Sequence, residues 1–267
     1  MAKRKKRNNR RWYVIAFTTA LIFCLLVFTN PGKYFLYWLN SQFGSQKNNY
    51  EKITKVGVTL PDGYSIFGID VSHYQNDIDW VRVADFKSEK FTVEFAFIKA
   101  TEGTSMIDSY FKKNWNETKD VGIPRGAYHY FKPNVNAQLQ ADHFCRNVVM
   151  SKGDLPPVLD IEETANGIDK KSLVNSVYIW LQIVERHYGV RPIVYTGAFF
   201  YETYFRGSII EKYPLWIAHY YEEKPATFAD WKFWQFSDKA KIDGINHHVD
   251  VNVFYGNYSQ LNDLKLK

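Results

Sequence analysis

Short apolar runs alternate with longer amphipathic stretches along residues 64–267. The short runs, rich in β-branched and aromatic residues, predict eight strands at residues 65–72, 93–100, 126–131, 158–161, 192–196, 215–220, 232–236 and 248–254. Apolar positions at helical spacing predict helices near residues 80–86, 110–121, 136–149 and 172–188. This alternation is typical of an α/β protein with a largely parallel sheet.

Eight strands of this kind can close into a barrel, which leaves no strand edge exposed. The predicted fold class is therefore α/β: a TIM-like barrel of eight strands with about five helices, preceded by one N-terminal transmembrane helix. Reactive groups in such barrels collect at the carboxyl ends of the strands. Polar residues at or near those predicted ends are Asp70, Lys99, Glu102, His129, Asp160, Glu162, Tyr195, His219, Gln235 and Asp250.

The fourth predicted strand leads into two acidic residues, Asp160 and Glu162. Because side chains alternate across a strand, both carboxyl groups should face the same way, with Cα atoms about 6.5 Å apart, whereas Glu163 should point elsewhere. Two neighbouring carboxylates repel each other, so one takes a raised pKa and stays protonated while the other is ionised. The simpler interpretation is a polar strand end in solvent. Asp70 and Asp250, predicted at the same barrel mouth, favour a functional site.

Aromatic residues are predicted to gather at the same mouth. Each of them alone is most simply a core residue. Together with carboxylates, however, they are typical of a polysaccharide site, because sugar rings stack on aromatic faces and the leaving oxygen needs an acid. The residues are Tyr74, Tyr128, Tyr130, Tyr195, Trp216, Tyr220 and Trp234.

The first 63 residues follow a different pattern. Residues 1–11 form a basic tail, predicted to be cytoplasmic, that carries seven Lys and Arg residues. The net charge of +6 belongs to this tail, and the remainder of the chain is close to neutral. The charge therefore does not indicate a nucleic-acid partner.

Residues 12–30 are predicted to be a single transmembrane helix. The stretch 12–28 contains no charged residue and would form about 26 Å of helix, close to the thickness of a bilayer core. The preceding positive charges place the N-terminus in the cytoplasm and the domain outside it, in the periplasm or at the cell surface. A cleaved signal peptide is the alternative, although no small-x-small site follows the apolar run. Residues 31–63 are predicted to be a juxtamembrane stalk, and residues 64–267 the barrel domain.

Eight short motifs occur in order between residues 66 and 254. They are FGIDVSHYQ at 67–75, FIKATEG at 97–103, GAYHYF at 126–131, LDIE at 159–162, PIVYT at 192–196, LWIA at 215–218, WQF at 234–236 and VDVN at 249–252. Together they resemble glycoside hydrolase family 25, the lysozymes that cleave the β-1,4 bond between N-acetylmuramic acid and N-acetylglucosamine. The resemblance implies that peptidoglycan glycan strands are the partner, and that residues 64–267 are a catalytic barrel domain with eight strands and five helices.

The resemblance also implies roles for the acidic residues. Glu162 matches the general acid and base, and Asp160 the residue that orients or polarises the 2-acetamido group of the substrate. Asp70 and Asp250 match two further acidic positions. The resemblance suggests a substrate-assisted route with retention of configuration, and direct attack by water with inversion stays open.

Candidate substrate contacts come from the same motifs. Tyr128, Tyr195 and Trp216 match positions that line the groove of the family, and Tyr130 and Gln235 complete the predicted set. No metal, cofactor or nucleic acid is expected, and the protein is expected to be a monomer held at the membrane by its N-terminal helix.

Two other functions are compatible with parts of the sequence. A membrane-anchored, metal-dependent polysaccharide hydrolase or deacetylase could use Asp70, His73, His129 or the pair His247 and His248. Adjacent histidines on a strand face opposite ways, however, and the sequence has no H-x-x-x-H run. A non-catalytic sugar-binding barrel is the second alternative, and the complete acidic set speaks against it.

Overall fold

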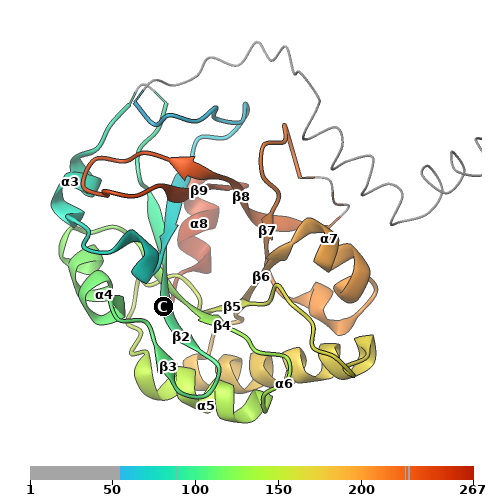
Figure 1. Cartoon of the computed structure of the whole chain (residues 1–267). Helices are drawn as coiled ribbons and strands as arrows, with labels where there is room; N and C mark the ends of the chain where they lie inside the picture. The colour runs from blue at the N-terminus through green and yellow to red at the C-terminus, as the bar shows by residue number, and fades with distance from the viewer. Residues whose placement is uncertain (1–54, 89, 226, 228) are drawn as a thin grey trace, which may run out of the picture. The chain divides into compact units, whose positions relative to one another are not determined.

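The computed structural model describes residues 55–88, 90–225, 227 and 229–267 (Figure 1). Eight strands of this part form a closed barrel, because β1 pairs with both β2 and β9. The barrel strands are β1 (Phe67–Val71), β2 (Phe95–Glu102), β4 (Arg125–Tyr130), β5 (Val158–Asp160), β6 (Ile193–Gly197), β7 (Leu215–Ala218), β8 (Trp231–Ala240) and β9 (Val249–Phe254). The short β3 (Met106–Ile107) pairs with β2 at its edge. The predicted eight-stranded barrel is confirmed.

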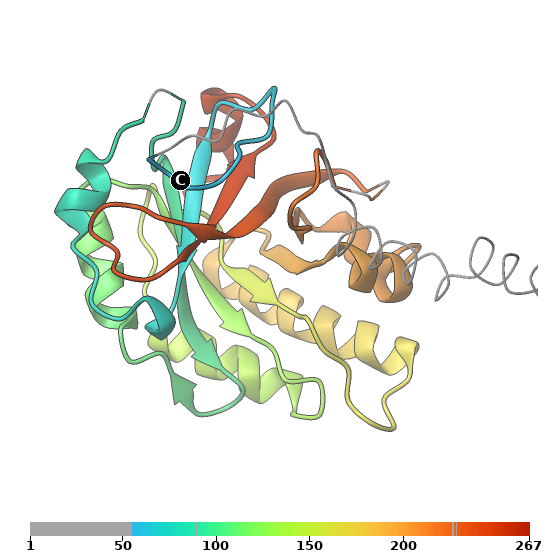
Figure 2. The ribbon, with the colours of Figure 1, turned by 45° about the horizontal axis from the view of Figure 1, so that its top comes forward.

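Strand β9 is the exception to the expected parallel arrangement. It runs antiparallel to both β8 and β1, whereas the other neighbouring barrel strands are parallel. The physical reason is the short connection of residues 241–248, which can form a hairpin but not the longer crossover that parallel strands need. The amino end of β9 therefore lies beside the carboxyl ends of the other strands, as the turned view shows (Figure 2).

The described part of the chain contains six α-helices rather than about five. They are α3 (Trp80–Asp85), α4 (Phe111–Asp120), α5 (Ala137–Asn147), α6 (Lys170–Tyr188), α7 (Ala198–Phe200) and α8 (Tyr258–Leu264). Three short turns are 3-10 or π-helical: η1 (His73–Gln75), η2 (Tyr201–Phe205) and η3 (Ile209–Lys212). The sequence did not predict α8, a helix of 7 residues that begins at a capping box formed by Asn257 and Gln260. Its Leu261 packs against the interior of the barrel, so α8 covers the amino-terminal opening.

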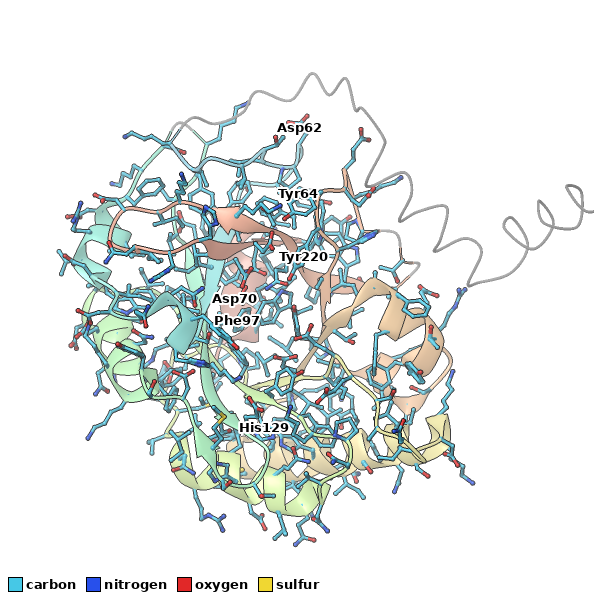
Figure 3. The ribbon with its side chains drawn as sticks, in the orientation of Figure 1. Asp62, Tyr64, Asp70, Phe97, His129 and Tyr220 are labelled. Carbon is cyan, nitrogen blue, oxygen red and sulfur yellow. The ribbon has the colours of Figure 1, made fainter. Side chains whose placement is uncertain are left out.

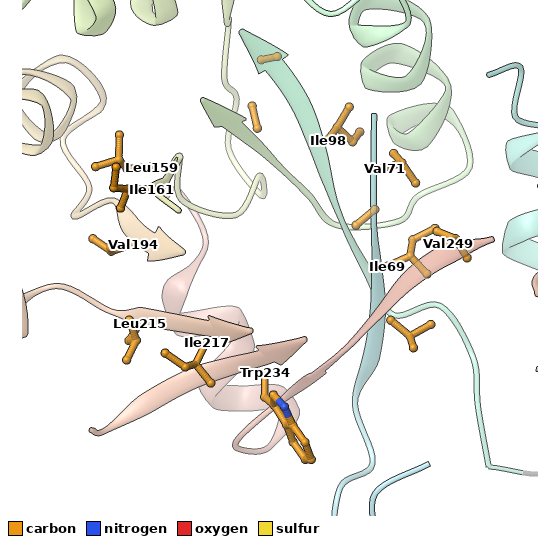
Figure 4. Packing of buried hydrophobic residues seen from close by; sticks show 14 of the residues in the cluster. Ile69, Val71, Ile98, Leu159, Ile161, Val194, Leu215, Ile217, Trp234 and Val249 are labelled. Carbon is orange, nitrogen blue, oxygen red and sulfur yellow. The ribbon is translucent and has the colours of Figure 1, made fainter. Parts of the chain in front are cut away.

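The alternation of each strand divides the core into two layers. Inside the barrel, Phe97 of β2 stacks on Trp216 of β7 with ring centroids 4.5 Å apart. Gly68 and Gly126 make room for the interior rings, because a Cβ on Gly68 would lie 2.5 Å from the ring of Phe95. Outside the barrel, residues of the opposite parity pack between the strands and the helices (Figure 4). They include Ile69, Val71, Ile98, Leu159, Val194, Ile217 and Val249.

The packed part of the chain starts before Tyr64. Val56 and Leu60 are buried in the outer layer of the core, and the backbone N–H of Lys241 donates to the carbonyl of Val56. These residues lie at the end of the predicted stalk, 31–63, so the last part of that segment belongs to the folded unit. The predicted tail and transmembrane helix, residues 1–30, lie outside the described residues. Within the described ranges, no helix is long and apolar enough to cross a membrane.

Candidate active site

A cavity of about 210 Å³ opens at the mouth where the carboxyl ends of the parallel strands meet the amino end of β9. All the residues predicted as catalytic or substrate-binding line it, and they lie on or directly after seven different strands of the barrel. They are Asp70, Tyr128, Tyr130, Asp160, Glu162, Tyr195, Trp216, Gln235 and Asp250. The cavity is also lined by Val71, Ser72 and Gln75, and by three residues that were predicted near the mouth without an assigned role, Tyr74, Lys99 and Tyr220. Trp234 was predicted at the mouth as well, but it packs in the outer layer of the core, where its Nε1 donates to the carbonyl of His219. The roles of the predicted residues stay predictions, but their convergence is a feature of the fold.

Asp70 on β1 is held by two amide donors. Its Oδ2 accepts from Gln235 Nε2 at 2.8 Å and from Asn252 Nδ2 at 2.7 Å. The side chain is 6% exposed, and this burial raises the pKa of Asp70 to about 6, against the lowering effect of the two hydrogen bonds. Figure 3 labels Asp70 together with Phe97, its partner in the register of β1 and β2, and Tyr220, which lines the same cavity.

Gln235 is oriented by two tyrosines. The hydroxyl groups of Tyr195 and Tyr220 both donate to its Oε1, each at 2.7 Å. With the carbonyl oxygen engaged, the amide nitrogen must point at Asp70. Tyr195 and Gln235 therefore hold an acidic residue in place in addition to lining the cavity.

Asn252 is a functional position that the sequence prediction missed. It lies two residues beyond Asp250 on β9, so the alternation of the strand places both side chains inside the barrel. Besides donating to Asp70, it accepts from Trp216 Nε1 at 2.8 Å. Trp216 is only 2% exposed, so it forms the floor of the cavity rather than an open platform for a sugar. The alternation rule alone could have found Asn252.

Asp160 and Glu162 share a hydrogen bond between their carboxyl groups. Asp160, at the end of β5, is 5% exposed, whereas Glu162 keeps solvent access through the cavity. Burial, and then the charge of Glu162, raise the pKa of Asp160 well above its ordinary value. Partial burial and the charge of Glu163 also raise the pKa of Glu162, while the hydrogen bond from Asp160 lowers it.

The pKa values of both carboxyl groups are raised, so the pair retains a proton to higher pH than two separate carboxyl groups would. That Glu162 carries this proton while Asp160 is ionised stays a prediction. The Oδ1 atom of Asp160 has no hydrogen-bond partner among the described residues. A donor from a ligand could therefore change where the proton lies.

Asp250 adds a further acidic group to the cavity. Burial and then the charges of Asp70, Asp238 and Glu162 raise its pKa to about 9. Asp250 is therefore neutral at neutral pH, and the cavity carries less negative charge than its four acidic residues suggest.

Lys99 supplies positive charge at the edge of the cavity. Its Nζ donates to Glu102 at 2.8 Å and lies 4.9 Å from the ring centre of Tyr130. Lys132 joins the same network, with Glu102 at 3.2 Å and Glu163 at 3.1 Å. Glu163 thus points away from the catalytic pair into an ion pair. The charge of Lys99 lowers the pKa values of both Asp160 and Glu162.

The histidines considered as metal ligands are engaged elsewhere. His129 faces away from the cavity toward α5 and α6 (Figure 3), where it contacts Thr101 and Gln140, and burial lowers its pKa to about 3. The sequence predicted that His129 lies near the end of a strand, but the alternation of side chains along β4 directs it outward. His73 pairs with Asp108 at 2.8 Å, and His247 contacts Asn76 at the surface. The described residues contain no group of three or more His, Cys, Asp or Glu side chains that could hold a metal ion.

A barrel with several buried carboxyl groups at its carboxyl-terminal mouth, beside tyrosine walls, defines the protein as a barrel-type glycoside hydrolase. Residues 69–245 match the model of glycosyl hydrolases family 25. The chain belongs to this family.

Similar proteins agree with this assignment. YegX of Escherichia coli (strain K12) is 46% identical over 79% of this chain and 78% of its own length. Lysozyme M1 of Streptomyces globisporus is 35% identical over 75% of this chain and 71% of its own length. Among solved structures, a family 25 glycosyl hydrolase from Bacillus anthracis has a TM-score of 0.70 and 33% identity, covering 83% of this chain and 100% of the other.

Proposed function

We propose that this protein is a lysozyme, an N-acetylmuramidase that hydrolyses the β-1,4 bond between N-acetylmuramic acid and N-acetylglucosamine in peptidoglycan. Membership of family 25 and the likeness to Lysozyme M1 support the activity. The observation that carries the mechanism is the carboxyl pair, in which Glu162 reaches the open cavity and Asp160 lies buried behind it. The family acts on peptidoglycan, which supplies the glycan substrate.

In this mechanism the substrate moves the shared proton. The N–H of a 2-acetamido group donates to a carboxylate oxygen of Asp160, which favours ionised Asp160 and shifts the proton to Glu162. Glu162 then donates this proton to the glycosidic oxygen as the C–O bond breaks. The acetamido carbonyl oxygen attacks the sugar carbon, and ionised Asp160 stabilises the positive charge of the resulting oxazolinium. The Glu162 carboxylate finally takes a proton from the attacking water.

Asp70 and Asp250 have a supporting role in this scheme. Their side chains lie at the same mouth, and the charge of Asp70 raises the pKa values of both Asp160 and Asp250. A cavity whose acids resist ionisation keeps a proton available for the leaving oxygen at neutral pH.

The products of purified peptidoglycan test the proposal. Mass spectrometry of the fragments should find N-acetylmuramic acid at the new reducing ends. Reducing-end N-acetylglucosamine would assign the cleavage to the other bond of the glycan and refute the muramidase. The anomeric configuration of the first product, followed by NMR, separates retention from direct attack by water with inversion.

We further propose that residues 12–30 anchor the protein as a single-pass membrane protein with an extracytoplasmic, monomeric domain. The apolar run and the preceding basic tail support this orientation. The full chain should sediment with membranes, and a variant that lacks residues 1–54 should remain in the aqueous fraction with intact activity. A full chain that is recovered without residues 1–30 would identify a cleaved signal peptide instead.

A further inference from the structure

Tyr74 is an exposed aromatic residue at the edge of the catalytic cavity. It is 72% exposed, although it lines the same cavity as the four acidic residues. It lies on η1, the turn that directly follows β1 and therefore follows Asp70 by four positions. The sequence places Tyr74 among the aromatic residues of the mouth, but neither the predicted catalytic and substrate-binding set nor the proton chemistry includes it. Other exposed aromatic residues of the described chain, such as Tyr255 and Tyr258, do not line this cavity, so the position of Tyr74 and not its exposure alone points to a ligand.

The turn that carries Tyr74 is fixed from both sides. Ser72 and Gln75 form a capping box, in which the backbone N–H of Ser72 donates to Gln75 Oε1 at 2.9 Å. Gln75 Nε2 donates to the carbonyl of His248 at 3.1 Å, which ties the turn to the start of β9. The backbone of Tyr74 therefore cannot move freely in spite of its exposure.

The ring of Tyr74 is supported by His73. The two rings are in contact in a tilted arrangement, with centroids 4.3 Å apart and an angle of 32° between their planes. Buried Asp108 holds His73 by accepting from its backbone N–H at 2.9 Å and by contacting its Nδ1 at 2.8 Å. Asp108 is itself fixed, because its backbone N–H donates to the carbonyl of Ala100 at 2.9 Å. The aromatic face is thus held in position before any ligand arrives, which lowers the entropic cost of binding.

The small volume of the cavity limits how much of a long substrate it can enclose. A volume of about 210 Å³ lies below the roughly 300 to 1,000 Å³ of pockets that enclose drug-sized ligands. Such a cavity has room for little more than the sugar that reacts. Neighbouring sugars of a polysaccharide must therefore pass over the rim, where Tyr74 lies.

We propose that Tyr74, backed by His73, is a stacking platform for a pyranose ring next to the cleaved bond. This inference rests on the proposed function, since it assumes a glycan substrate. The apolar face of a pyranose ring covers the exposed tyrosine ring, and the hydroxyl groups of the sugar remain in water. The platform binds substrate and transition state equally, so it affects KM rather than the chemical step.

The test measures binding in a background without turnover. Glu162→Gln protein should bind purified glycan strands, and adding Tyr74→Ala should weaken this binding about tenfold, whereas Tyr74→Trp should retain it. Tyr258→Ala is the matched control, because Tyr258 is 52% exposed and lies near Glu94 at the opposite opening of the barrel. Unchanged affinity in the Tyr74→Ala protein, or equal losses from both alanine variants, would overturn the platform.

Kinetic measurements on the Tyr74→Ala enzyme, with Glu162 intact, separate this inference from the proposed function. Tyr74→Ala should raise KM for long strands with little change in kcat, and the pH profile should keep its shape. A short substrate that ends inside the cavity should show a smaller effect. If kcat falls while KM is unchanged, the residue acts on the reaction and the platform is wrong. If the unaltered enzyme releases no fragments with N-acetylmuramic acid at their reducing ends, the proposed muramidase activity is refuted. The role of Tyr74 is still decided by the binding measurement.

Discussion

Asp70 and Asp250 lie directly opposite each other on the antiparallel strands β1 and β9. Like charges at such a position repel each other, and both side chains face the same cavity. The structure accommodates them by giving the two acids different surroundings. Asp70 has two amide donors, whereas the pKa of Asp250 is raised to about 9 and its carboxyl group stays neutral at neutral pH.

The first prediction concerns the pH dependence of stability. Unfolded Asp250 ionises near pH 3.8, but the folded carboxyl group resists ionisation up to about pH 9. The folded state is therefore penalised progressively as the pH rises between these values. Asp250→Asn should raise the thermal midpoint at pH 8 by several degrees relative to the unaltered protein, and should have a smaller effect at pH 4. Asp263→Asn, at an exposed position of α8, is the control and should change neither midpoint. An equal effect of Asp250→Asn at both pH values would contradict the raised pKa.

The second prediction tests the proton donor. Glu162→Gln keeps the shape of the side chain but removes the acid, so release of fragments from dye-labelled peptidoglycan should fall by a factor of about 100 to 10,000. The neighbouring Glu163→Gln is the matched control. It loses an ion pair with Lys132, in which the glutamate side chain is 44% exposed, and a minor charge effect on the pKa of Glu162, and it should remain active. Full activity of Glu162→Gln with an unchanged thermal midpoint would show that another group donates the proton.

The third prediction concerns the electrostatic role of Lys99. Its charge lowers the pKa values of Asp160 and Glu162, so Lys99→Met should raise them. The alkaline limb of the pH profile of kcat/KM should therefore move to higher pH by roughly one unit, because the required proton is retained longer. Lys132→Met removes a cation from the same network without facing the pair, and should move this limb less. A shift to lower pH in Lys99→Met would have the wrong sign for this mechanism.

The fourth prediction concerns Asn252. Asn252→Ala removes a donor to Asp70 and leaves the buried indole N–H of Trp216 without its partner. We expect the free energy of unfolding to fall by about 2 to 4 kcal/mol in chemical denaturation. Asn262→Ala, on the exposed face of α8, should cost less than about 0.5 kcal/mol. A cost for Asn252→Ala no larger than this control would show that water replaces both hydrogen bonds.

The sequence was sufficient to predict the barrel and the residues around its mouth. Apolar runs of strand length fix which segments enter the barrel, and alternation fixes which side chains face inward, as for Asp160 on β5 and Asn252 on β9. The direction of β9 was missed, because the strand pattern of residues 248–254 is the same in parallel and antiparallel pairing. Helix α8 was missed as well, since a stretch of 7 residues carries too few turns for its period to stand out.

The site was harder to predict than the fold. His129 shows why the inward or outward direction of a side chain is difficult to predict. The pairing of β2 with β4 shifts in register between Lys99 and Thr101. Lys99 therefore stays in the cavity, whereas Thr101 lies beside His129, which faces outward. The location of the shared proton also depends on burial, which differs between Asp160 and Glu162 although they stand two residues apart. Such differences arise only when strands distant in the sequence come together.

The contact between Asp70 and Asn252 joins residues separated by 182 positions of the chain. One comes from the first barrel strand and the other from the last, so the wall of the cavity is incomplete until β9 takes its place between β1 and β8. Strand β9 also supplies Asp250 to the cavity, so a chain that has folded only through β8 lacks one of the four acidic residues and one of the two amide donors to Asp70. Closing the barrel and completing the site are therefore the same structural event.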